Sequence, residues 1–315
     1  MHKSIKQHVY IIVVLAILLF SSYNNQKIYG HNFAGDESAS FLALMDQMQT
    51  EMNLINTNLM ANNNQSVIVK DHLNKINELY TENIKKEIAE RNERVANEIS
   101  SIINEIDIAI GQEIKDTSGL VKDFNDIIGE AISVRIDQEA LNNSTIQALH
   151  FADLINSIDI SYATAVGAKP MNMSAMNMST NNNMFHGINN SNSNNTMSSS
   201  SDVQMDHGDN NNMAGMSKNT GHSSNPSETS TISNIASYQT AKEQTNVAID
   251  LFNSTIKQNI PSNATENANV IESNLQQLKD LIESKAPYDK VMGVIHGPIQ
   301  TTMLETFNLP LKNSK

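Results

Sequence analysis

The sequence predicts an all-α protein, an antiparallel bundle of long helices interrupted by a disordered insert rich in Met, Asn and Ser. Apolar residues recur at alternating spacings of three and four through most of the chain, which is the pattern of a helix with one buried face. No run alternates apolar and polar residues as a half-buried strand would. Hydrophobic residues make up 39% of the chain, aromatic residues 5%, and Trp is absent, so the composition favours aliphatic seams between helices.

The first predicted helix spans residues 36–60, and its start is capped by Asp36 or Ser38. Its apolar seam is formed by Phe41, Met45, Met48, Met52, Ile55 and Leu59. Because these methionines lie on the seam, we expect them to pack in the core rather than to bind metal. The polar run ANNNQS at residues 61–66 ends this helix.

A second, very long helix is predicted from this break to about Ile114. The seam consists of Val69, Leu73, Ile76, Tyr80, Ile84, Ile88, Val95, Ile99, Ile102 and Ile106. A helix of about 45 residues would be roughly 70 Å long, and its charged centre, KKEIAERNERVANE, would face water on most sides. Helices at residues 120–136 and 145–166 are the expected packing partners, so residues 31–166 form a four-helix bundle.

Helical periodicity disappears between residues 167 and 231, the segment that we call the Met/His tract. It consists mostly of Asn, Ser, Met, Gly and Thr and has too few aliphatic residues to offset the entropy of ordering, which predicts disorder. Helical patterns resume at residues 232–260 and 264–284 on either side of Pro261. A short helix should then end near the HGP sequence at 296–298, before one or two final turns. This C-terminal region, residues 232–315, could complete the same bundle.

The first thirty residues are typical of a signal peptide. Lys3 and Lys6 precede an apolar run at residues 9–20, and a polar stretch follows. This run is shorter than the roughly 20 residues that cross a bilayer. We therefore expect a secreted protein or one in the cell-envelope space, with an uncleaved N-terminal anchor as the alternative. Removing residues 1–30 changes the formal net charge from −13 to −16, a surface that attracts cations and repels nucleic acid.

Several classes of chemistry have no support in the sequence. The absence of Cys excludes disulfides, thiolate metal sites and covalently attached c-type haem. There is no Gly-rich phosphate loop, no His-Glu-x-x-His, no Gly-x-Ser-x-Gly and no paired Glu-x-x-His motif. The acidic residues follow helical surface positions, where solvated faces are the ordinary explanation. We expect a protein without catalytic activity.

The composition of the Met/His tract indicates copper. Nine of the 16 methionines lie between residues 171 and 216, where Ile and Lys are nearly absent, which argues against a drifting linker that gathered Met by chance. A thioether is a soft ligand that needs no deprotonation and selects Cu(I), whereas imidazole also suits Cu(II). The candidate ligands are Met171, Met173, Met176, Met178, Met184, His186, Met205, His207, Met213, Met216 and His222.

Two segments of the tract carry a family resemblance. MDHGDNNNMAGMS at residues 205–217 resembles the extracellular Met/His tracts of Ctr-type copper transporters and of secreted copper-resistance proteins, and MNMSAMNM at residues 171–178 has the same character. The matching residues of the longer segment are Met205, Asp206, His207, Gly208, Met213, Met216 and Ser217. The resemblance implies capture of extracellular copper, with thioethers holding Cu(I) and imidazoles holding Cu(II). It covers some 45 of the 315 residues, and it does not extend to transport, because the membrane helices and Met-x-x-x-Met filter of Ctr-type transporters are missing. In outline, the whole chain is similar to secreted helical proteins of copper-dependent archaea.

Other histidines offer further ligands. If the signal is cut after Gly30, the α-amine and imidazole of His31 would form half of a histidine-brace copper site, completed by His72, His150 or His296. For these three the structural alternatives are stronger. His72 is expected to flank the seam, and His296 to lie at a helix end near the C-terminal carbonyls.

Local chelation is a further possibility for one pair. His150 and Asp153 are three residues apart on one side of a helix and could bind one ion together.

These features leave two main hypotheses. The first is a secreted or envelope-associated copper-binding protein that captures, buffers or hands over copper. The alternative is a structural or adhesive surface protein with the tract as a glycosylated spacer. Asn-x-Ser/Thr sequons occur at Asn64, Asn142, Asn143, Asn172, Asn177, Asn189, Asn194, Asn253 and Asn263. The expected partners are copper ions, a copper-accepting or surface protein, and further copies of the chain through its helices, with no nucleic acid.

Overall fold

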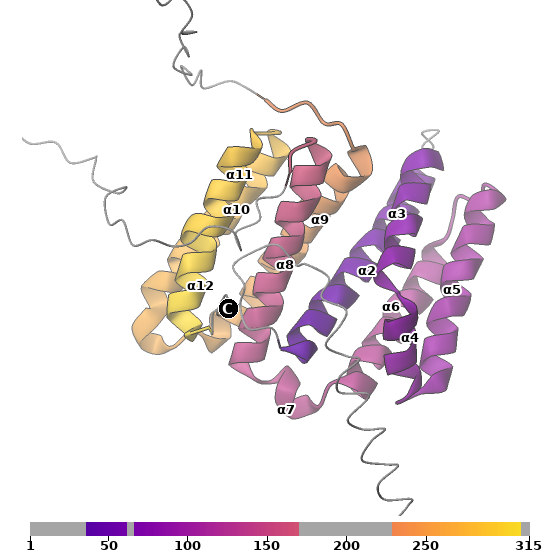
Figure 1. Ribbon diagram of the computed structural model, residues 1–315, viewed down its shortest axis with the longest axis horizontal. Coiled ribbons are helices and arrows are strands. Elements are labelled where there is room, and N and C mark those ends of the chain that lie inside the picture. The colour runs from indigo at the N-terminus through magenta and orange to yellow at the C-terminus, as the bar shows by residue number, and fades with distance from the viewer. Residues whose placement is uncertain (1–35, 62–65, 170–228, 310–315) are drawn as a thin grey trace, which may run out of the picture. The chain divides into compact units, whose positions relative to one another are not determined.

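The computed structural model describes residues 36–61, 66–169 and 229–309 (Figure 1). All regular structure within these ranges is helical, which confirms the predicted all-α class. None of the described helices is both long and apolar enough to cross a membrane. The predicted signal peptide and most of the Met/His tract lie outside the described residues.

The first described helix agrees closely with its sequence pattern. Helix α2 spans Glu37–Met60, and the Asp36 carboxylate caps it by accepting hydrogen bonds from the backbone N–H of Ser38 at 2.7 Å and of Ala39 at 3.3 Å. The predicted seam is buried from Phe41 to Ile55, including the thioethers of Met45, Met48 and Met52, and Leu59 at its end is half-buried. These methionines are core residues, as expected.

The prediction of one helix of about 45 residues is wrong, because the chain folds into three shorter helices. They are α3 (Ser66–Leu79), α4 (Glu82–Ala89) and α5 (Glu93–Gly111). Thr81 and Asn92 have extended backbones, and the side chain of each accepts a hydrogen bond from the N–H of the third residue of the following helix. Each of these caps starts a new helix, although the apolar spacing continues across both breaks.

Three more helices complete the N-terminal half. They are α6 (Ser118–Arg135), the short α7 (Gln138–Leu141) and α8 (Ser144–Ala165). A first hydrophobic cluster is built from α2 to α6, around side chains such as Met48, Ile99 and Phe124. The predicted helices at residues 120–136 and 145–166 are thus confirmed to within two residues at each end.

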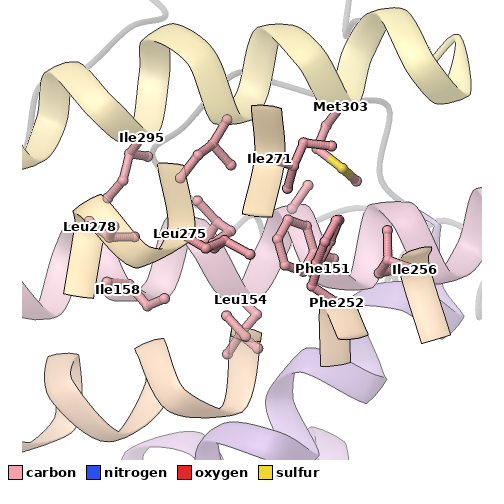
Figure 2. Close-up of a cluster of buried hydrophobic side chains, with 14 of the residues drawn as sticks. Phe151, Leu154, Ile158, Phe252, Ile256, Ile271, Leu275, Leu278, Ile295 and Met303 are labelled. Carbon is pink, nitrogen blue, oxygen red and sulfur yellow. The ribbon is translucent and has the colours of Figure 1, made fainter. Parts of the chain in front are cut away.

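The C-terminal helices pack mainly against α8. In chain order they are α9 (Ile235–Leu251), a π-helical segment (Phe252–Ile256), two 3₁₀ turns (Lys257–Asn259 and Ser262–Ala264), α10 (Thr265–Glu283), α11 (Tyr288–Val294), a π-helical segment (Ile295–Ile299) and α12 (Gln300–Phe307). Figure 2 shows the second hydrophobic cluster, in which Phe151 and Leu154 of α8 meet residues from these elements. The ring centroids of Phe151 and Phe252 are 6.0 Å apart.

The expected helix end at the HGP sequence is also wrong. Residues 295–299 form a π-helical segment that joins α11 to α12, with Pro298 inside it. Proline has no N–H, and the wider π turn accommodates the missing i→i−4 hydrogen bond without ending the helix. His296 therefore lies inside a continuous helical element rather than at a helix terminus.

Helix α8 is buried on most of its surface because it contacts both α2 and α9. Its buried residues include polar ones, Gln147, His150, Asn156, Ser157 and Asp159. Buried polar groups need hydrogen-bond partners. The buried polar residues of α8, α2 and α3 find these partners on neighbouring helices and form polar clusters with them.

Candidate functional site

The predicted copper ligands lie outside the described residues and remain predictions. They are His31, Met171, Met173, Met176, Met178, Met184, His186, Met205, His207, Met213, Met216 and His222. The structure does describe both points at which the chain leaves and re-enters the helical body. We call these points, Ala165 to Ala168 and Ser230 to Asn234, the neck.

On the outgoing side of the neck, α8 ends in a Schellman motif. The N–H of Ala168 donates to the carbonyl of Ala163 at 2.9 Å, and the N–H of Gly167 donates to the carbonyl of Thr164 at 3.2 Å. Gly167 has φ 70°, a left-handed conformation that favours glycine. The helix thus stops sharply where the Met/His tract begins.

On the returning side, the chain is bonded to the end of α8. The carbonyl oxygen of Ala165 accepts three hydrogen bonds, from the N–H of Ser233 at 2.8 Å, the N–H of Asn234 at 3.1 Å and the hydroxyl of Ser233 at 3.0 Å. Asn234 then caps α9 through its side chain. Both ends of the tract therefore meet at one end of the α8–α9 pair.

A second set of bonds holds the returning chain to the turn after α10. The N–H of Ser230 donates to the carbonyl of Lys285 at 2.6 Å, and its hydroxyl donates to the carbonyl of Ala286 at 3.2 Å. The Tyr162 hydroxyl donates to the same Ala286 oxygen at 2.6 Å. Burial, reinforced by neighbouring Tyr238, raises the pKa of Tyr162 to about 12, so this phenol stays a donor. Gly167 and Ser230, which the sequence placed inside the disordered insert, are thus hydrogen-bonded residues of the body.

Each histidine that the structure describes faces a carboxylate; His72 and His150 are buried, and His296 is half-buried. His72 Nδ1 lies 2.6 Å from Glu51 Oε2, and His150 Nε2 lies 2.7 Å from Asp46 Oδ2. His296 Nε2 lies 3.4 Å from Asp159 Oδ2. His72, which the sequence places beside the seam residue Leu73, is only 1% exposed.

The suggested chelation by His150 and Asp153 is not what the structure contains. His150 pairs with Asp46 of α2, whereas Asp153 accepts a hydrogen bond from the Ser40 hydroxyl at 2.9 Å. Burial raises the pKa of Asp153, although the bond from Ser40 and the nearby positive charge of His150 act in the opposite direction. Both side chains are committed to contacts between α8 and α2.

His296, within the π-helical segment, belongs to a polar cluster with Asp159, Tyr288 and Gln300. Its Nδ1 is 2.8 Å from Gln300 Oε1, and the Tyr288 hydroxyl donates to Asp159 Oδ2 at 3.1 Å. Burial lowers the pKa of His296, but the hydrogen bonds with Asp159 and Gln300 and the charge of Asp159 outweigh it, so the pKa lies above its usual value. The expected role near helix-end carbonyls is therefore replaced by an interhelical ion pair.

The cluster around His72 joins α2, α3 and α9. Glu51 Oε1 accepts a hydrogen bond from the Thr240 hydroxyl at 2.9 Å, and His72 Nε2 lies 2.9 Å from Gln239 Oε1. Gln239 and Asn58 exchange two amide hydrogen bonds of 2.9 and 3.0 Å. A polar opening of about 320 Å³ leads from the surface to Glu51, His72 and Thr240.

This cluster does not have the connectivity of a hydrolytic triad. In a triad the imidazole lies between the hydroxyl and the carboxylate and takes the hydroxyl proton. Here the carboxylate of Glu51 lies between Thr240 and His72, so the hydroxyl has no imidazole base. Among the described residues there is also no group of three or more His, Asp and Glu side chains that could hold a metal ion.

The burial of Glu51 and Asp159 corrects the expectation that the acidic residues lie on solvated faces. Both are 1% exposed. One sequence signal for Glu51 existed: it lies seven residues before Asn58, so the two polar residues occupy the same side of α2, next to the methionine seam. Nothing local marks Asp159, whose partners come from residues more than 120 positions away.

Comparisons of the chain with protein-family models, curated proteins and solved structures found no significant match. Function is therefore inferred from the residues themselves. The described residues contain buried histidine–carboxylate pairs and a neck held together by hydrogen bonds. The segment in which the sequence predicts copper ligands lies between the two halves of the neck.

Proposed function

We propose that this protein binds copper outside the cytoplasm, through the thioethers and imidazoles of the Met/His tract. The observation that carries the proposal is the concentration of nine of 16 methionines in residues 171–216 of a chain without Cys. Thioethers would hold Cu(I), and His186, His207 and His222 would bind Cu(II). In a secreted or envelope-associated protein this chemistry suits capture, buffering or handover to a copper-accepting partner.

The arrangement of the body supports the tract as the copper-binding part. Of the methionines that the structure describes, Met45, Met48, Met52 and Met303 are at most 1% exposed, so their sulfur atoms are out of reach of an ion in solution. The described histidines are engaged with carboxylates. The body is therefore a weak competitor for copper.

The neck supports the same proposal. The Ala165 carbonyl binds the returning chain at Ser233 and Asn234, so described residues hold the two ends of the tract together. Between these ends the sequence predicts a flexible chain. A flexible chain with Met-x-Met and Met-x-x-Met spacings can wrap several thioethers around one Cu(I) ion.

An anaerobic Cu(I) competition titration against a chromogenic chelator tests the proposal on residues 31–315. The test variant replaces Met171, Met173, Met176, Met178, Met205, Met213 and Met216 with Leu. The control variant replaces the exposed Met60 and the half-buried Met292 of the body with Leu. We expect at least one Cu(I) to be lost in the test variant only, and binding by the parent chain to persist on acidification, because thioethers do not protonate.

A third variant separates the two oxidation states. Replacing His186, His207 and His222 with Gln should remove Cu(II) binding and leave most Cu(I) binding intact. Equal, weak Cu(I) binding by the parent and the methionine variant would overturn the proposal. The structural or adhesive alternative would then lead, since the sequon residues Asn142, Asn143, Asn253 and Asn263 are exposed on the body.

A further inference from the structure

The hydrogen bonds around His72 determine which of its ring nitrogens carries a proton. Asn58 Nδ2 donates to the backbone carbonyl of Leu54 at 2.8 Å, which fixes the orientation of this amide. Asn58 Oδ1 then accepts from Gln239 Nε2 at 3.0 Å, so the Gln239 oxygen is the atom that faces His72 Nε2. An amide oxygen is only an acceptor, and His72 Nε2 must therefore be protonated.

The other ring nitrogen faces Glu51. His72 Nδ1 and Glu51 Oε2 are 2.6 Å apart, a distance that requires one proton between them. Either an imidazolium donates to a carboxylate, or a neutral imidazole accepts from a carboxylic acid. Both forms contain the same number of protons and have no net charge, so they are two descriptions of one coupled pair.

Loss of that shared proton would be costly. It would leave the Nδ1 lone pair facing a carboxylate oxygen and would bury a negative charge, since Glu51 and His72 are both 1% exposed. A buried charge without a partner is strongly destabilising. Separating the helices that hold the two groups would relieve this cost.

We propose that the His72–Glu51 pair is a proton-dependent latch that holds the start of α9, and with it the neck, against α2 and α3. Glu51 is on α2 and His72 on α3, while Gln239 and Thr240 bring α9 to the pair. These two residues lie in the first turns of α9, directly after Ser233 and Asn234 of the neck. Loss of the proton therefore loosens the neck before the rest of the helical body.

The polar opening beside the pair gives protons a path. The charged residues that line it, apart from the pair, are Asp71, Lys75 and Glu78 of α3, and Lys75 lies 3.8 Å from Glu78. The lining residues from α8 (Ile160, Ser161 and Thr164) and from α9 (Asn234, Ala236, Ser237 and Thr240) are uncharged. From α2 only Glu51 lines the opening, and α5, which also packs against α3, contributes no lining residue. Water at this opening can exchange the proton without unfolding the body.

The His150–Asp46 pair is a natural control for this latch. His150 Nε2 faces Asp46, but its buried Nδ1 has no hydrogen-bond partner among the described residues. The hydrogen bond of His150 therefore needs only one ring proton, at Nε2, whereas the two hydrogen bonds of His72 need a proton at each ring nitrogen position. The two pairs should respond differently to pH.

The test uses the full chain without copper, so that it is independent of the proposed copper binding. Proton and nitrogen-15 NMR of the histidine rings at pH 7.5 should show a proton on Nε2 of His72 and a strongly deshielded proton in the short bond between Nδ1 and Glu51. The variant Glu51→Gln keeps the side-chain shape but cannot share the proton. In this variant, hydrogen exchange at the Ser233 and Asn234 amides should be roughly tenfold faster or more at the same pH, since a charge-assisted hydrogen bond is lost.

The control variant Asp46→Asn should leave the His72 ring signals and the exchange of the neck amides unchanged. A parent chain that at pH 7.5 lacks either the Nε2 proton of His72 or the proton shared with Glu51 would overturn the proposal, as would unchanged neck exchange in Glu51→Gln. If Glu51→Gln does not fold, the His72 ring signals of the parent chain decide the question alone.

Discussion

Replacing residues 170–228 with an eight-residue Gly/Ser linker should leave the body folded and slightly more stable. The contacts that close this loop lie in the body, at the Ala165 carbonyl and along the α8–α9 interface. The replacement shortens the connection between α8 and α9 from 69 residues to 18. Loop-closure entropy scales as (3/2)RT ln n, so the free energy of unfolding should rise by about 1 kcal/mol.

Urea unfolding monitored by far-UV circular dichroism measures this change. The m value should stay the same, because the surface buried by the described helices is unchanged. A 59-residue Gly/Ser linker restores the original length and should return the parent stability, which separates loop length from tract sequence. A loss of stability of more than about 1 kcal/mol, or a smaller m value, would mean that the tract packs on the body and would refute the reasoning.

Three further outcomes are expected. Glu113 has φ 56° in the turn after α5, a left-handed conformation that glycine adopts without strain. Glu113→Gly should therefore raise the free energy of unfolding by about 0.5–1 kcal/mol in urea titrations, and an unchanged value would contradict the strain. Met48→Ala should lower the free energy of unfolding by about 2–5 kcal/mol in the same assay. Met60→Ala, at a position 55% exposed, should change it by less than about 0.5 kcal/mol. Similar losses in both variants would contradict the assignment of the seam to the core. The pKa of His296 is raised in the folded state, so its contribution is complete below the unfolded value of about 6.5 and is lost as pH rises through the folded value. Stability should therefore fall as pH rises above about 6.5, and His296→Gln should reduce this slope. An unchanged slope would count against the pair with Asp159.

Continuous apolar seams made several helices predictable. Helices α2, α6, α8 and α10 follow their patterns to within two residues because each seam lies within one helix and faces one core. The breaks at Thr81 and Asn92 were not predictable from periodicity, since the spacing of the apolar residues continues through them. At these positions a polar cap competes with helix continuation, and the packing of α4 against α5 decides the outcome.

The polar clusters could not be predicted from local patterns because their partners are distant in sequence. Thr240 lies 189 residues from Glu51, and His296 lies 137 residues from Asp159. A histidine or an acid at a helix position looks the same whether it faces water or a partner on another helix. Only the packing of α9 against α2, and of the π-helical segment 295–299 against α8, brings these groups together.

The proposed copper ligands and the buried histidines respond to different variables, and this difference separates the two proposals. Thioethers bind Cu(I) without releasing a proton, so Cu(I) affinity should not follow the protonation of His72. If the neck only tethers the tract, Glu51→Gln should loosen Ser233 and Asn234 and leave Cu(I) affinity unchanged. If affinity changes with the latch, the closed neck must limit the conformations in which the tract can gather its ligands. Reciprocity then requires that Cu(I) binding change the exchange of the neck amides by the same free energy.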